Sequence, residues 1–174
     1  MLETTFISNK TRKEIIKYLF ITVFAMTAWI LQIAIFSQIL FFDTSPNLIY
    51  LGTVFSGIMF GPFFGGLYGI LSSFFSASLL YDHTFYLSYP LIGFLAGILV
   101  KSNIADELLL FVLLTISLIF GFELINGIQY NMHHPIDISS RLWLITFSGA
   151  ILNTILSPLF YLFMNFIIKK LNIR

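Results

Sequence analysis

The chain has 174 residues, of which 58% are hydrophobic and 10% are charged, whereas soluble domains carry about 25% charged residues. This composition excludes a soluble domain and predicts a membrane protein in contact with lipid. Nine Lys and Arg against eight Asp and Glu exclude a nucleic-acid-binding footprint, and the lack of cysteine excludes disulfides and a thiolate metal site.

The first apolar run covers residues 18–40 and follows a basic segment. A bilayer core of about 30 Å needs roughly 20 apolar residues per helix, so this run is long enough to span it. The run is too long for the core of a signal peptide, and its polar start has no small-residue cleavage site. We therefore expect it to remain as a transmembrane helix.

The second apolar run extends from Asn47 to Leu80, which is too long for one helix at about 1.5 Å per residue. Gly61 and Pro62 interrupt it. Because proline removes a backbone donor and disfavours helix in the residue before it, we expect a tight reversal between spans at 47–60 and 63–80. A re-entrant hairpin is the alternative, since the first of these spans is short.

Three further apolar runs follow, at 85–100, 107–127 and 142–168. Each is bounded by polar or charged residues. The sequence thus predicts an all-α polytopic membrane protein, in which residues 1–174 form a single membrane domain of six transmembrane helices.

The distribution of basic residues predicts the orientation, because short cytoplasmic loops are enriched in Lys and Arg. With the N-terminus inside, Arg141 is the only basic residue on the outer side. The acidic residues Asp43, Asp82 and Asp137 lie on that side too. We therefore expect both termini in the cytoplasm. The eight basic residues on the cytoplasmic side are Lys10, Arg12, Lys13, Lys17, Lys101, Lys169, Lys170 and Arg174.

Small residues recur every four positions in the middle of the chain. Helices in lipid gain little from hydrophobic burial against one another, so their association depends on close packing and interhelical hydrogen bonds. We interpret the repeat as a helix-packing seam; a backbone surface that a ligand approaches is the alternative. The seam comprises Gly57, Gly61, Gly65, Gly69, Ser73, Ala77, Gly93 and Gly97.

Polar residues in or beside the apolar spans form a candidate polar site, because such residues are costly in a membrane and often functional. Its members are Glu123, Asn126, Asp82 and Asn153. Glu123 and Asn126 are three residues apart and share a face of one predicted helix. The Glu123 carboxylate could handle a proton or a substrate; a hydrogen bond to a neighbouring helix is the structural alternative.

Motifs of catalysis are missing from the sequence. There is no Gly-x-Ser-x-Gly elbow, Walker A loop or HExxH, and no intramembrane pair of carboxylates. His133 and His134 are adjacent and lack the spacing of a tetrahedral zinc site. We therefore predict no enzyme activity, no catalytic residues, no metal and no cofactor.

Several motifs together resemble the rod shape-determining protein MreD family. They begin with Ser45-Pro46-Asn47-Leu48 and continue with Gly61-Pro62, the Gly-rich stretch 65–69, and residues 89–97. Gln32 in the first span and the stretch 152–159 in the last also fit. The resemblance covers roughly residues 30–168, and Pro46, Asn47 and Pro62 are its motif residues.

This resemblance implies a non-catalytic scaffold of the bacterial cell-elongation machinery in the cytoplasmic membrane, needed for rod shape and lateral peptidoglycan synthesis. The implied partner is MreC, and through it MreB, RodA and a penicillin-binding transpeptidase. The sequence departs from the family at one position. Many members carry an Asp about eight residues after the glycine that matches Gly69, whereas this chain has Ala77 there and no Asp until Asp82.

The alternative is a substrate-binding component of an energy-coupling-factor vitamin transporter, which has a similar length and a similar six-span plan. Such a protein would bind a vitamin in its outer half, where Glu123, Asn126, Tyr81, Asp82 and His83 gather on the predicted topology. The first span does not favour it, because Ala25, Ala28 and Ala34 lack the four-residue spacing of the small-residue docking motif.

Overall fold

The computed structural model describes residues 9–41, 44–79, 87–100, 107–133 and 146–173. These residues form helices, without a β-strand in the described ranges, so the predicted all-α class is confirmed for them. The elements are α1 (Asn9–Ala34), the short 3₁₀ helix η1 (Phe36–Gln38), α2 (Leu48–Phe60), α3 (Pro62–Leu79), α4 (Ser88–Leu99), α5 (Glu107–His133) and α7 (Ser148–Leu171).

Three stretches of helix among the described residues are long and apolar enough to cross a membrane: Thr11–Gln38, Glu107–Ile125 and Ser148–Leu171. Two shorter apolar helices, α2 and α4, lie beside them. The chain is therefore consistent with a membrane protein. The count of six spans and the orientation stay predictions, and Lys101, Arg141 and Arg174, on which the orientation partly depends, lie outside the described residues.

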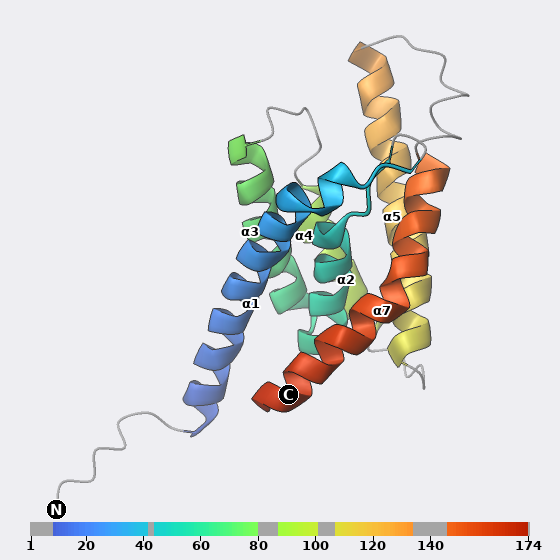
Figure 1. Ribbon diagram of the computed structural model, residues 1–174. Coiled ribbons are helices and arrows are strands. Elements are labelled where there is room, and N and C mark those ends of the chain that lie inside the picture. The colour runs from blue at the N-terminus through green and yellow to red at the C-terminus, as the bar shows by residue number, and fades with distance from the viewer. Residues whose placement is uncertain (1–8, 42–43, 80–86, 101–106, 134–145, 174) are drawn as a thin grey trace, which may run out of the picture.

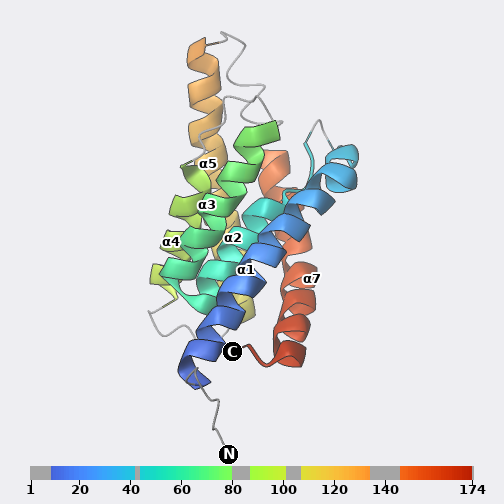
Figure 2. The ribbon, with the colours of Figure 1, turned by 90° about the vertical axis from the view of Figure 1, so that its left-hand side faces the viewer.

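Helix α2 lies at the centre of the bundle, with α1, α3, α4, α5 and α7 around it (Figures 1 and 2). Every residue from Leu48 to Ile58 is buried. At about 1.5 Å per residue α2 is shorter than the hydrocarbon core of a bilayer, and a helix that is apolar all round needs cover on every side. The surrounding helices provide that cover.

The chain turns back between α2 and α3, which pack side by side as an antiparallel hairpin (Figure 1). Gly61 has a φ of 92°, which side-chain-bearing residues rarely adopt, and its N–H donates to the carbonyl of Gly57 at 3.0 Å. Pro62 is the first residue of α3, where its missing N–H breaks no helical hydrogen bond. The positive φ of Gly61 and the missing N–H of Pro62, both unfavourable inside a helix, are therefore compatible with this turn.

Aromatic rings connect the central helix to the others. The Phe55 ring of α2 lies 6.0 Å from that of Phe111 on α5 and 5.9 Å from those of Phe160 and Tyr161 on α7. The Tyr161 hydroxyl also donates to Oε2 of Glu107 at 3.1 Å, which fastens the start of α5 to α7. Edge-on ring pairs at these separations stabilise packing beyond the apolar area they bury.

Candidate functional site

Polar side chains from three helices meet at the start of α2. Asn47 caps this helix, because its Oδ1 accepts hydrogen bonds from the N–H groups of Ile49 and Tyr50, both at 3.1 Å. An Asn in this position satisfies helix donors that have no partner within the helix. Pro46, just before it, has no backbone N–H, so its carbonyl is the one backbone group that can form a hydrogen bond.

Asn153 on α7 binds the same segment. Its Oδ1 accepts from the N–H of Asn47 at 2.8 Å, and its Nδ2 donates to the carbonyl of Gly149 on its own helix at 2.8 Å. The residue is 3% exposed. Both ends of the buried amide are therefore bonded, as a polar group in an apolar environment requires.

Gln32 on α1 completes the arrangement from the other side. Its Nε2 donates to the carbonyl of Pro46 at 2.9 Å, and its Oε1 accepts from the N–H of Leu48 at 2.8 Å. The Gln32 amide thus binds the residues before and after Asn47, and Asn153 binds Asn47 itself. We call Gln32, Pro46, Asn47 and Asn153 the polar junction. Three of its hydrogen bonds join the start of α2 to α1 and α7, and two more cap α2 itself.

A second contact extends the polar junction toward the start of α7. Oγ1 of Thr44 and Oγ of Ser148 are 3.1 Å apart, and the Thr44 hydroxyl also donates to the carbonyl of Phe41 at 2.7 Å. Because a hydroxyl has one proton, Ser148 is the donor in the first of these bonds. The segment between η1 and α2 is therefore fixed to α7 at two points.

The predicted packing seam lies where α2, α3 and α4 meet. A Cβ atom at Gly65 would meet the backbone of Gly93, and one at Gly57 or Gly93 would likewise meet backbone of a neighbouring helix. The same is true of Gly69 against Tyr89 and Pro90, and of Gly97 against Gly61 and Pro62. At these positions helix backbones touch, which only glycine permits.

The remaining members of the seam behave differently. Gly61 has open space around it and serves the turn. The Ser73 hydroxyl donates to the carbonyl of Gly69 one turn earlier in its own helix, at 2.9 Å. Ala77 lies on α3, but its side chain is outside the described residues. The contact surface therefore runs from Gly57 to Gly69 on one side and from Tyr89 to Gly97 on the other.

The candidate polar site is placed only in part. Glu123 lies on α5 and is half-buried, whereas the side chain of Asn126 and all of Asp82 lie outside the described residues, as do His83, His134 and Asp137. Asn153 belongs to the polar junction. Among the described residues, no three His, Cys, Asp or Glu side chains gather at one point.

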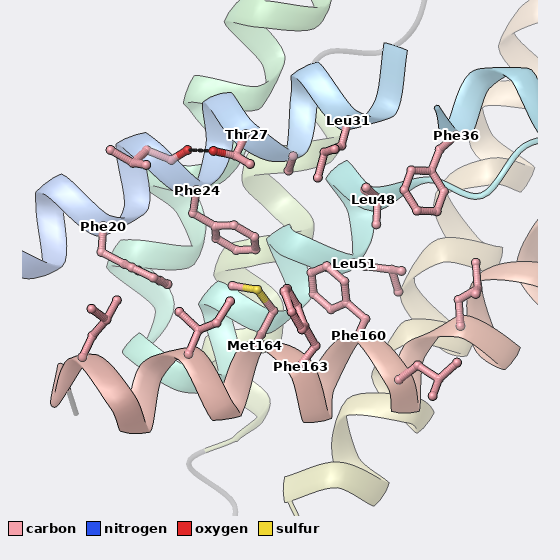
Figure 3. A pocket seen from close by; sticks show the side chains of 16 residues that line it. Phe20, Phe24, Thr27, Leu31, Phe36, Leu48, Leu51, Phe160, Phe163 and Met164 are labelled. Atoms are coloured by element: carbon pink, nitrogen blue, oxygen red, sulfur yellow. Dashed lines mark hydrogen bonds between the residues drawn. The ribbon is translucent and has the colours of Figure 1, made fainter. Parts of the chain in front are cut away.

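An apolar groove lies between α1 and α7, with α2 as its floor (Figure 3). It has a volume of about 590 Å³. Its labelled lining comes from Phe20, Phe24, Thr27, Leu31 and Phe36 on one wall, Leu48 and Leu51 on the floor, and Phe160, Phe163 and Met164 on the other wall. The Phe24 and Phe160 rings, 6.2 Å apart, bring the two walls together at the floor.

Sequence reasoning missed the groove and the bridging position of Gln32. A polar amide in an otherwise apolar span was the available signal for Gln32, since it must bond to something nearby. The groove has no such signal, because its lining residues are ordinary membrane-span residues that become a groove only through the angle between two helices.

Comparison of the chain with models of protein families, with characterised proteins and with solved structures finds no match.

Proposed function

We propose that the protein is a non-catalytic scaffold of the bacterial cell-elongation machinery, of the kind represented by the MreD family. It would sit in the cytoplasmic membrane as a six-span protein with both termini in the cytoplasm. MreC would be its direct partner, and MreB, RodA and a penicillin-binding transpeptidase would be reached through MreC. Its contribution to rod shape and lateral peptidoglycan synthesis would be the positioning of these partners.

The polar junction is the observation that supports this proposal best. Pro46 and Asn47, which carry the sequence resemblance, together with Gln32 and Asn153, which also belong to it, bind one another or the adjoining backbone. Residues that define the resemblance thus hold three helices at fixed positions. A scaffold needs this property, because its partner must meet the same surface each time.

The proposed orientation has support in the arrangement of the helices. The start of α1 and the end of α7 lie at the same end of the molecule (Figures 1 and 2). Arg12, Lys13 and Lys17 belong to the first of these ends, and Lys169 and Lys170 to the second. Basic residues gathered on one side favour a cytoplasmic position for both ends.

A partner helix would find an unpartnered apolar stripe on α7. Ile151, Ile155, Leu162 and Phe166 are exposed and recur with helical spacing on the side of α7 that faces away from the bundle. A single-span partner such as MreC can pack on such a stripe by side-chain interdigitation. Phe166→Ala and Ile155→Ala would weaken that contact without touching the bundle interior.

Co-purification tests the proposal. The full chain is expressed with MreC from the same genome, solubilised in mild detergent and isolated through a tag on the chain. MreC is expected in the eluate, in reduced amount with the Ile155→Ala/Phe166→Ala variant, while an unrelated single-span protein of equal abundance is not. Depletion of the chain in its host is expected to convert rods into spheres.

The opposite results would support the transporter component. If MreC is lost on washing and the purified chain gains thermal stability from a vitamin at micromolar concentration, the scaffold proposal is wrong. A ligand that binds the folded state at many times its Kd raises the melting temperature by mass action, so the second arm gives a positive signal.

A further inference from the structure

The groove between α1 and α7 is at least as long as one leaflet of a bilayer is thick. Along α1 its lining runs from Phe20 to Leu31, about 16 Å at about 1.5 Å per residue, and along α7 from Leu156 to Leu171, about 22 Å. Half of a hydrocarbon core of about 30 Å is about 15 Å. The groove is therefore long enough for an acyl chain that extends from one membrane surface to the middle of the bilayer.

The volume of the groove fits a single small ligand. At about 590 Å³ it falls within the range of about 300–1,000 Å³ typical of single-ligand pockets. Thr27 is the one polar side chain in its lining, and its hydroxyl already donates to the carbonyl of Val23 at 2.8 Å. The part of a ligand that lies in this groove is therefore hydrocarbon.

Two lysines extend the groove walls at one end. Lys17 lies three residues before Phe20, and Lys170 lies three residues after Ile167, so each shares a helix face with a lining residue. This is the end at which α1 starts and α7 finishes (Figure 1). The described charged side chains at this end of the molecule are Arg12, Lys13, Glu14, Lys17, Glu107, Lys169 and Lys170, a net positive set.

We propose that this groove binds one anionic phospholipid of the leaflet that borders the start of α1. An acyl chain lies along the apolar walls, and the phosphate group lies between Lys17 and Lys170. An anionic lipid matches both halves of the groove, because the walls accept hydrocarbon and the lysines offset the headgroup charge. The proposal is independent of the scaffold function and of any partner protein.

Native mass spectrometry of the full chain in detergent tests this site. The two probes are 1-palmitoyl-2-oleoyl phosphatidylglycerol and the phosphatidylcholine with the same acyl chains, so only the headgroup charge differs. The wild-type chain is expected to retain one phosphatidylglycerol more strongly than phosphatidylcholine. A lysine near an anionic phosphate contributes about a fivefold gain in affinity, so Lys17→Gln/Lys170→Gln is expected to lower phosphatidylglycerol affinity about 25-fold.

A matched pair of variants separates a specific site from general surface charge. Arg12→Gln/Lys169→Gln also removes two positive charges, but Arg12 lies at the edge of the groove face of α1 and Lys169 lies on the far side of α7. This control is expected to keep the preference. Equal loss in the two double variants, or equal retention of both lipids by the wild type, would overturn the proposal.

A second pair tests the apolar walls. Thr27 is exposed to the groove, so Thr27→Phe fills it without disturbing the interior, whereas Met26→Phe adds a ring on a different face. Thr27→Phe is expected to reduce retention of both lipids and Met26→Phe neither. A photo-crosslinking residue at Phe163 is expected to capture lipid in native membranes; capture of a protein helix instead would show that the groove serves a partner.

Discussion

The two sides of the central helix are packed in opposite ways. On one side α2, α3 and α4 touch backbone to backbone at Gly57, Gly65 and Gly93. On the other side α1 and α7 meet through large rings, including Phe24 and Phe160, and leave a groove of about 590 Å³ between them. An open apolar groove would be costly in water, whereas in a membrane acyl chains can cover it, so the two sides of α2 should respond differently to added side-chain volume.

We call the side of α2 that packs against α3 and α4 the closed side, and the side that faces α1 and α7 the open side. The contrast predicts that the closed side tolerates no added atom. Gly65→Ala places a methyl group against the backbone of Gly93 and Gly57, which cannot move aside as a flexible side chain could. We expect a loss of about 3 kcal/mol or more in folding stability. The adjacent Gly66→Ala meets only open space up to the Pro90 carbonyl at 4.0 Å.

The Gly66→Ala control should therefore be neutral or stabilise the helix by up to about 1 kcal/mol. Both variants are compared with the wild type by thermal unfolding in detergent. Equal melting temperatures for the two variants would show that α3 and α4 are not in backbone contact.

The polar junction should show the next largest effect. Asn153→Leu removes the acceptor of the Asn47 N–H and leaves that half-buried donor without a partner, which costs about 1–3 kcal/mol. Asn165 is the matched control on the same helix, since its Oδ1 is buried and has no hydrogen-bond partner among the described residues. Asn165→Leu is expected to leave the melting temperature unchanged or raise it. A larger loss at Asn165 than at Asn153 would contradict the hydrogen bonding described for α7.

Gln32 should contribute somewhat less, because its side chain is half-buried whereas that of Asn153 is buried. Gln32→Leu breaks the bonds to Pro46 and Leu48, and we expect a loss of about 1 kcal/mol. Gln38→Leu alters an exposed residue of η1 and serves as the control. A double variant with Asn153→Leu should lose less than the sum of the two single losses, because both residues hold the same segment. Strict additivity would show that they act separately.

The open side should show the smallest effect on stability. Thr27→Phe introduces a ring where space is available, and we expect a change within about 0.5 kcal/mol, although lipid retention falls. The same ring at Met26 should be equally neutral. A large loss at Thr27 alone would mean that the groove is narrower in the membrane than its walls indicate.

Local chemistry explains which parts of the fold were predictable. Gly61 and Pro62 predict a reversal because each residue has a backbone property that a helix interior rejects. The small-residue repeat likewise shows where backbones can approach. The basic segment was assigned to a polar start before residue 18, whereas α1 begins at Asn9, because arginine and lysine are good helix formers and extend a helix already nucleated in an apolar run.

The sequence indicated some residues of the polar junction but not the contacts between them. Asn47 and Asn153 were both singled out, but for different reasons, and nothing in their separation along the chain predicts a bond between them. The groove was not predictable at all, since it depends on how far two helices diverge. Distances between remote segments are set by the packing of whole helices, which a local pattern of residues does not encode.

The most direct test of the contrast between the two sides is the access of oxygen to spin labels in liposomes. The chain has no cysteine, so single cysteines can be introduced and labelled without a background. A label at Thr27, inside the groove, is predicted to collide with oxygen about as often as one at Met26 on the lipid-facing side of α1. A label at Thr27 as shielded as one at Ala25, which is buried and does not line the groove, would contradict an open groove and the account of the bundle built on it.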